Sequence, residues 1–153
     1  MKKILVVILI ILVIPASSYA FPMIYAGAQQ LQFGFEFRES DDWNLQFGYG
    51  NFVTDELLLG ALFTYSDNVN TTWSIGATME HHFHLGTMTF PYLAAFLIYE
   101  DYGSGNHVRF GPGIGINHFL TNYLSIDLSA RYLLSTNSRD EDLEITGGLR
   151  VLF

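Results

Sequence analysis

Three stretches of the chain alternate between apolar residues and polar or glycine residues, and this period of two constrains the fold more than any other feature. The apolar sets are Leu31, Phe33, Phe35 and Phe37, then Trp43, Leu45, Phe47 and Tyr49, and then Leu124, Ile126, Leu128, Ala130 and Tyr132. Successive side chains of a β-strand point to opposite faces, so each stretch predicts a strand with one apolar and one polar face. A soluble sandwich would turn the apolar face inward and a membrane barrel would turn it outward. Periodicity alone does not separate these two architectures.

The first twenty residues have the pattern of a cleaved export signal. Lys2 and Lys3 precede an apolar run at 4–14, and Ser18 and Ala20 supply the small residues that signal peptidase needs. We expect cleavage between Ala20 and Phe21, which leaves residues 21–153 as one domain. The alternative is a membrane-anchoring helix, but the run is too short, since crossing a bilayer takes roughly 20 apolar residues.

Three features together favour the membrane barrel. The export signal places the chain outside the cytoplasm. Small residues dominate the polar faces, as the narrow interior of a small barrel requires, and they include Gly34, Gly48, Gly60, Gly76, Gly111, Gly113, Gly115 and Gly148. The apolar faces are rich in aromatic residues, with Trp43 and Trp73 near strand ends where interface girdles lie. The prediction is an all-β, up-and-down antiparallel transmembrane β-barrel of eight strands.

The connections between the predicted strands alternate in kind. We expect strands at 29–38, 43–50, 57–66, 72–84, 89–99, 108–118, 124–134 and 143–153. Four connections are polar and acidic, while the turns at 52–57 and 119–124 share a Phe-x-Thr-Asp/Asn-x-Leu pattern. In a meander the acidic connections all fall at one end. Because bacterial barrels have short periplasmic turns and longer outer loops, both termini are expected in the periplasm.

Charge and cysteine content exclude several classes of function. The chain has no cysteine, so it forms neither disulfides nor thiolate metal sites. Removal of the export signal leaves arginine as the only cationic residue in an acidic chain. Nucleic acid is therefore not an expected partner, because phosphate binding needs clustered Lys and Arg.

The C-terminal strand carries the most specific resemblance to a known family. The chain resembles the small outer-membrane β-barrel domain superfamily that includes OmpX- and OmpW-like proteins. Thr146, Gly148, Val151 and Phe153 match the terminal pattern that the barrel-assembly machinery reads in that family. The resemblance implies this machinery as a partner during biogenesis, and lipids and lipopolysaccharide of the outer membrane as surroundings of a monomeric barrel.

Two motifs suggest ligand binding. His82 and His84 would share one face of a strand and His81 the other, and Glu80 is a possible third metal ligand. The alternative is histidines that face the lumen or the periplasmic interface, and we predict no metal or cofactor. Residues 111–115 read Gly-Pro-Gly-Ile-Gly, superficially a phosphate loop. However, Pro112 lacks a backbone donor and no helix follows, so small lumen-facing residues explain the motif better.

Barrel enzymes that modify lipid A need an activated serine near the outer membrane surface. The serines considered are Ser66, Ser104, Ser135 and Ser138, with His107 close to Ser104 in the sequence. The His-x-Ser-Asn arrangement that would resemble a lipid A deacylase is absent, so no catalytic residue is predicted.

The predicted lumen carries many charges, which must be paired because an unpaired buried charge is costly. The inward-facing set is Glu36, Arg38, Glu80, Arg109, Asp127, Arg131, Glu144 and Arg150. If the last two strands pair from Leu134 with Leu143, Asp127 lies opposite Arg150 and Arg131 opposite Thr146. We therefore expect an Asp127–Arg150 ion pair in a filled lumen, with Glu80 or His82 as further members.

These expectations favour a structural or interaction scaffold with short acidic surface loops. We expect an acidic rim at the cell surface, formed by Asp41, Asp42, Glu100, Asp101, Asp140, Glu141 and Asp142. The alternatives are a narrow channel or carrier for small solutes and, with less support, a lipid A-modifying enzyme.

Overall fold

The computed structural model describes residues 24–37, 43–67, 71–85, 88–101, 105–136 and 141–153, which form a closed barrel of eight strands. The strands are β1 (Gln29–Phe37), β2 (Trp43–Phe52), β3 (Leu57–Asp67), β4 (Thr71–His82), β5 (Thr89–Asp101), β6 (Asn106–Phe119), β7 (Leu124–Ser135) and β8 (Glu141–Leu152). The predicted fold is confirmed, and every strand starts and ends within a few residues of its expected limits.

Some sequence predictions concern residues outside the described ranges. They are the export signal at 1–20 with its Ala20–Phe21 cleavage site, and Arg38, Asp41, Asp42, Ser104, Ser138 and Asp140.

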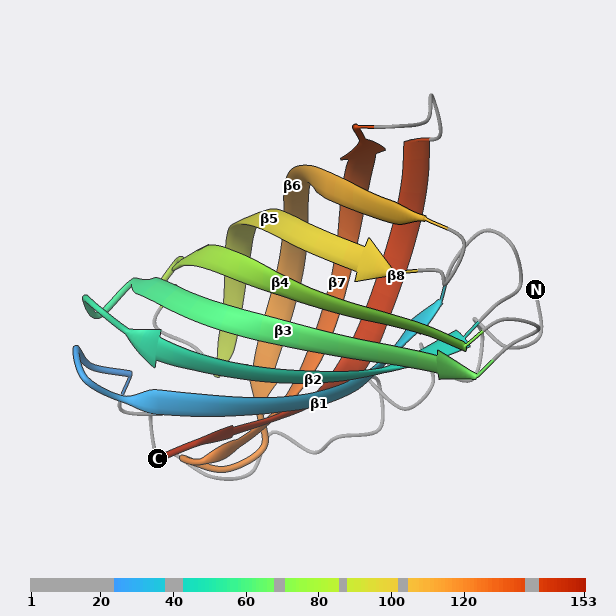
Figure 1. The fold of residues 1–153 in the computed structure, drawn as a ribbon. Helices are drawn as coiled ribbons and strands as arrows, with labels where there is room; N and C mark the ends of the chain where they lie inside the picture. Colours follow the sequence, from blue (N-terminus) through green and yellow to red (C-terminus); the bar gives the residue numbers. More distant parts are fainter. Residues whose placement is uncertain (1–23, 38–42, 68–70, 86–87, 102–104, 137–140) are drawn as a thin grey trace.

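Each strand pairs antiparallel with its neighbours in the sequence, and β1 pairs with β8 to close the barrel (Figure 1). At the closing seam, Gln30 stands opposite Leu152 and Gly34 opposite Gly148. The start of β1 and the end of β8 therefore lie at the same end of the barrel. We call it the turn end, because it carries the connections 53–56, 83–88 and 120–123, and the opposite end the loop end.

Two turns at the turn end have the same hydrogen-bonding pattern. The Thr54 hydroxyl oxygen accepts from the backbone N–H of Glu56 at 3.2 Å and of Leu57 at 3.0 Å. In the second turn, Thr121 accepts from Tyr123 at 3.2 Å and Leu124 at 3.0 Å. Threonine favours such local bonds. The repeated sequence pattern therefore makes the same turn twice.

The outer surface of the barrel wall is apolar and the interior is polar. Large side chains exposed on the outside include Phe33, Phe35, Phe47, Phe63, Trp73, Ile75, Leu93, Leu97, Phe110, Ile114, Ile145 and Leu149. Buried polar residues include Gln32, Gln46, Thr78, Asn117 and Thr146, in addition to the lumenal charges. This distribution is the reverse of a soluble sandwich and matches the membrane-barrel interpretation. Among the described residues, no helix is long and apolar enough to cross a membrane.

The predicted register of the last hairpin is wrong by two residues. Leu134 pairs with Glu141 instead of Leu143, so Asp127 stands opposite Gly148 and Arg131 opposite Glu144. Strand β8 begins at Glu141, in a segment that the sequence assigned to a loop. This register places the positively charged Arg131 directly opposite the negatively charged Glu144. Because the shift is an even number, every side chain keeps its predicted face.

The glycines of β6 make room for two aromatic rings of β5. A Cβ added at Gly113 would lie 2.7 Å from a Phe96 ring carbon, and one at Gly115 would overlap the Tyr92 ring. Gly113 and Gly115 are buried, whereas Pro112 is exposed on the outside. Since residues 111–115 lie within a continuous strand, they are not a phosphate loop, and Gly113 and Gly115 are its small lumen-facing residues.

Candidate functional site

The lumen contains two clusters of charged and polar side chains, one toward each end of the barrel. The turn-end cluster consists of Glu80, His82, Tyr92, Asp127 and Arg150. The loop-end cluster consists of Glu36, Asn44, Glu100, Arg109, Arg131, Asp142 and Glu144. All of these residues except Asp142 are buried.

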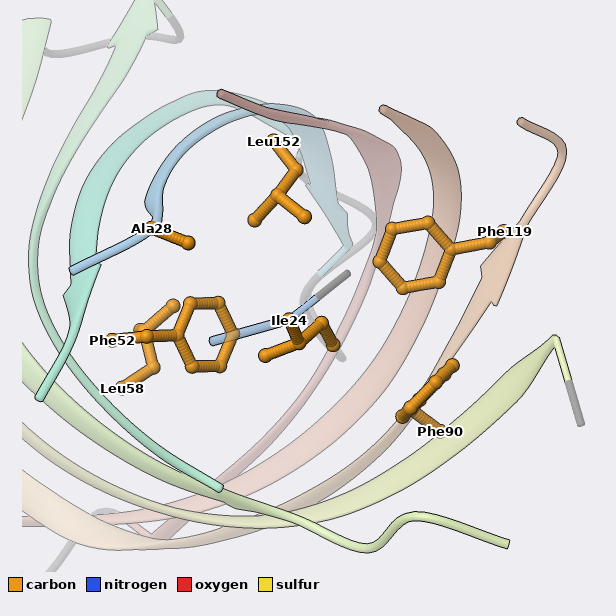
Figure 2. Close-up of a cluster of buried hydrophobic side chains, with 7 residues drawn as sticks. All are labelled: Ile24, Ala28, Phe52, Leu58, Phe90, Phe119 and Leu152. Carbon is orange, nitrogen blue, oxygen red and sulfur yellow. The ribbon is translucent and has the colours of Figure 1, made fainter. Parts of the chain in front are cut away.

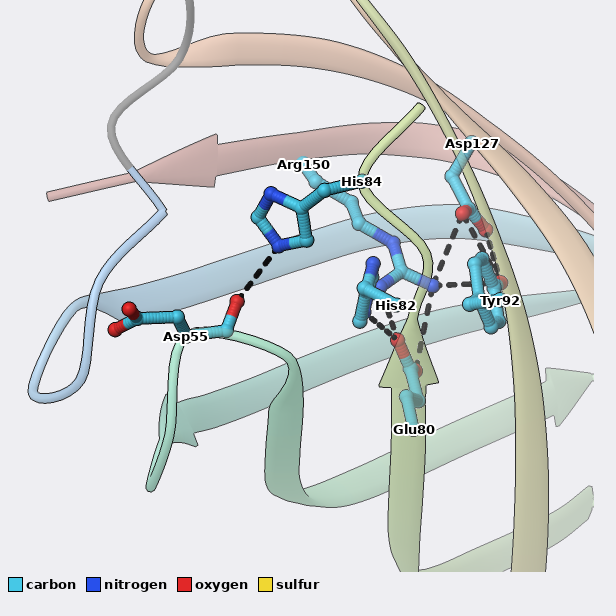
Figure 3. A network of polar contacts seen from close by, with 7 residues as sticks. All are labelled: Asp55, Glu80, His82, His84, Tyr92, Asp127 and Arg150. Carbon is cyan, nitrogen blue, oxygen red and sulfur yellow. Dashed lines mark hydrogen bonds and ion pairs between the residues drawn. The ribbon is translucent and has the colours of Figure 1, made fainter. Parts of the chain in front are cut away.

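Arg150 is the centre of the turn-end cluster (Figure 3). Its Nη1 lies 2.6 Å from Glu80 Oε2, and its Nη2 lies 3.0 Å from Asp127 Oδ2. Nη2 also donates to the Tyr92 hydroxyl at 2.7 Å, and the guanidinium lies 4.8 Å from the centre of the Tyr92 ring. The planar guanidinium can serve several acceptors at once, so one side chain links β8 to β4, β5 and β7 across the lumen.

The structure brings Asp127 and Arg150 together, although not as direct cross-strand neighbours. Arg150 stands opposite Ser125 in the ladder, and its side chain reaches Asp127 diagonally. Glu80 binds Arg150 directly, whereas His82 contacts Glu80 at 3.0 Å between Nε2 and Oε2.

Sequence reasoning missed Tyr92 in this cluster. Its hydroxyl donates to the Asp127 carboxylate, with 3.0 Å to Oδ2. The strand that contains Tyr92 is mostly apolar on both faces, so the alternating pattern did not mark the Tyr92 hydroxyl as an inward polar group. A tyrosine on an inward-facing strand position could have indicated this contact, because a buried tyrosine hydroxyl usually has a hydrogen-bond partner.

Two arginines join the strands of the loop-end cluster. Arg131 binds Glu36 of β1 and lies 2.5 Å from Glu144 of β8, measured from Nε to Oε2. Arg109 binds three carboxylates: Glu144 at 2.7 Å, Asp142 at 2.9 Å and Glu100 at 3.2 Å. The cluster therefore ties β5 and β6 to β7, β8 and β1, including the two strands that close the barrel.

The predicted acidic rim is wrong for Glu100, whose side chain is completely buried in the lumen. Strand β5 continues to Asp101, which carries Glu100 inward as part of the ladder. Asp142 also contacts the lumenal Arg109, although 41% of its side chain remains exposed. The acidic connections thus contribute to the lumen as well as to the surface.

Two small cavities lie beside the turn-end cluster. Each has a volume of about 10 Å³, and both are lined in part by Gln32, Leu62 and Glu80. A water molecule needs roughly 10–15 Å³ of such volume. Each of these two cavities is therefore the size of one water molecule.

The three neighbouring histidines point to different places. His81 is exposed on the outside, 3.8 Å from Glu56, while His82 is buried in the lumen. The prediction that His84 shares the lumenal face is wrong, because β4 ends at His82. His84 lies in the following connection, where its Nε2 is 2.8 Å from the Asp55 carbonyl oxygen. The described residues contain no group of three or more His, Cys, Asp or Glu side chains placed to hold a metal ion.

The sequence matches no known family model and no curated protein. The structure, in contrast, resembles several solved barrels. The N-terminal β-barrel domain of Pseudomonas aeruginosa OprF has a TM-score of 0.72 at 15% identity, covering 84% of this chain and 98% of that one. Neisserial surface protein A has a TM-score of 0.61 at 18% identity, with coverage of 82% and 95%. The outer membrane protein OprG from Pseudomonas aeruginosa has a TM-score of 0.62 at 9% identity, with coverage of 88% and 99%. At these identities the likeness shows a shared fold, that of the small outer-membrane β-barrel.

Proposed function

We propose that this chain is a small integral outer-membrane β-barrel that acts as a structural or interaction scaffold and does not pass solutes. The observation that carries this proposal is the filled lumen. Arg150 and Arg131 each bind carboxylates on other strands, and the cavities beside Arg150 are the size of single water molecules. Buried charges that are paired across the barrel resist opening, because separating one pair leaves both charges uncompensated.

The distribution of charge on the wall supports insertion into a membrane. The arginines among the described residues, Arg109, Arg131 and Arg150, are all buried in the lumen. The strands contain between 9 and 14 residues, and a tilted transmembrane strand needs about 9–11. An apolar outer wall of this height suits the hydrocarbon core of a bilayer.

The location and topology follow from the same proposal. After cleavage between Ala20 and Phe21, the barrel inserts with both termini in the periplasm and the acidic loops outside. Its surroundings are outer-membrane lipids and lipopolysaccharide, and it works as a monomer. We further propose that it is not an enzyme, and the buried Ser135 hydroxyl oxygen, which has no hydrogen-bond partner among the described residues, is consistent with this.

Replacing Phe153 with serine should reduce assembly of the barrel without affecting export. The Phe153 side chain is 53% exposed on the outside, while its backbone pairs with Gln29 at the closing seam. The change therefore removes the aromatic end of the predicted assembly signal and leaves the backbone pairing. Fractionation and immunoblotting should show less protein in outer membranes and more in the periplasm. Wild-type outer-membrane levels of F153S would contradict the assigned signal.

Purified barrel in planar lipid bilayers should produce no conductance steps above those of protein-free bilayers. The physical reason is that oppositely charged side chains are paired across the lumen, and a water path would have to separate them at a large free-energy cost. A general porin, inserted into the same bilayers, serves as the positive control. Reproducible steps that grow with salt concentration would overturn the closed scaffold and favour the narrow channel.

A further inference from the structure

The turn-end mouth of the barrel is closed by apolar side chains, and two of them, Ile24 and Ala28, lie outside the strands. The cluster contains Ile24, Ala28, Phe52, Leu58, Phe90, Phe119 and Leu152. Figure 2 shows Ile24 in the middle, with Phe52 and Leu58 on one side of it and Phe90 and Phe119 on the other. Ile24 precedes β1, and its side chain is only 7% exposed. The central part of the closure thus comes from a segment outside the strand ladder.

Hydrogen bonds hold this segment against the end of β2 and the turn that follows, and the Ala28 N–H closes the turn around Gly27 by donating to the Tyr25 carbonyl at 3.0 Å. Ala26 N–H donates to the Asp55 carboxylate at 2.9 Å, and Gly27 N–H donates to the Phe52 carbonyl at 2.6 Å. Gly27 has a φ of +94°, a conformation that suits glycine and reverses the chain before β1. Beyond this turn, the Gln29 N–H bonds to Phe153 and belongs to the barrel seam. Gly27 therefore lies at the turn between this segment and the barrel wall.

Polar groups lie immediately behind the apolar closure. The Phe52 ring packs on His82, with ring centres 5.3 Å apart, and Asn117 is the next inward residue of β6 after Phe119. Within the described part of the chain, His82 Nδ1 and both polar atoms of the Asn117 side chain have no hydrogen-bond partner. Buried polar atoms without partners are uncommon, because water would satisfy them. Opening of the closure would give water access to these atoms.

We propose that the turn-end mouth is a binding seat for a branched aliphatic side chain, which Ile24 fills from within the same chain, so that residues 24–27 form a removable plug. When the segment swings out about Gly27, the ladder of the barrel remains intact and water reaches His82 and Asn117. The seat is lined by aromatic and aliphatic side chains, and its occupant is the Ile24 side chain of the same chain. This inference goes beyond the scaffold proposal, since it concerns access to the lumen from one end.

The absence of cysteine allows a direct test with single thiols. In the folded chain in detergent, Ile24→Cys places a thiol in the seat, and Tyr25→Cys places one on the neighbouring residue, which is 53% exposed. We expect a water-soluble maleimide to label the residue-24 thiol at least about tenfold more slowly than the residue-25 thiol. The same rate should still be at least about tenfold higher than the rate at which the barrel unfolds, because local opening costs less free energy than global unfolding. Labelling at the unfolding rate would show that the segment is a fixed part of the fold. Labelling as fast as at residue 25 would show that the side chain at position 24 does not occupy the apolar cluster.

A second measurement separates the plug from the wall. Ser125 is 1% exposed and stands opposite Phe119 in the ladder, so Ser125→Cys reports on access past the mouth. Adding Ile24→Ala should speed labelling of this thiol by about tenfold, whereas adding Tyr25→Ala should leave it unchanged, because only the former empties the seat. Equal labelling rates for the residue-125 thiol in the Ile24→Ala and Tyr25→Ala variants would overturn the proposal. This outcome is independent of whether the barrel conducts ions in a bilayer.

Discussion

Replacing Arg150 with glutamine is expected to destabilise the folded barrel by about 3–5 kcal/mol, the cost typical of breaking a buried ion pair from one side. The change leaves Glu80 and Asp127 buried without the guanidinium that lies 2.6 and 3.0 Å from their carboxylate oxygens. It also removes the donor to the Tyr92 hydroxyl. Urea unfolding in detergent micelles measures the loss as a change in the free energy of unfolding.

The coupling between Arg150 and Asp127 should appear in a double-mutant cycle. Asp127→Asn alone destabilises the barrel, and the Asp127→Asn/Arg150→Gln double variant should lose less free energy than the sum of the single losses, because it removes both members of one pair. Asp142 offers a matched control, since it binds Arg109 in the other cluster. The losses from Asp142→Asn and Arg150→Gln should add. Additive losses for Asp127 and Arg150 would mean that their contact contributes no stability.

Replacing Gly148 with valine should prevent stable closure of the barrel, at a cost of about 3 kcal/mol or more, since the added carbons cannot be accommodated by side-chain rearrangement alone. A Cβ at this position would overlap the Phe33 carbonyl oxygen and lie 2.7 Å from the Gly34 Cα. Both atoms belong to the backbone of β1 at the seam with β8. The measurement is the fraction of folded protein, read from the band that shifts on heating in SDS gels.

The neighbouring glycine supplies the control for this steric argument. Gly147 lies in the same strand, and a Cβ added there meets no atom within 4 Å. Gly147→Val should therefore fold as well as the wild type and change stability by no more than about 0.5 kcal/mol. If both variants fold equally well, the close approach of β1 and β8 does not limit barrel closure.

The sequence by itself determined the strands and the faces of their side chains. The alternation is a local property: each residue of a strand points opposite to the next, so the pattern survives an error in pairing. Glu80, Asp127 and Arg150 could thus be assigned to the lumen before any register was known. The repeated threonine turns were also readable, because Thr54 and Thr121 bond only to residues that follow them closely in the chain.

Only the tertiary structure decided how far strands slide past one another and what their side chains reach. Pairing Leu134 with Glu141 instead of Leu143 preserves every face, so the alternating pattern cannot distinguish the two registers. Arg150 contacts Asp127 diagonally, two positions from the residue that faces Asp127, so this contact depends on the register that the structure sets. The place of Ile24 in the mouth depends on β2, β3, β5, β6 and β8 meeting around it, which happens only once the barrel has closed.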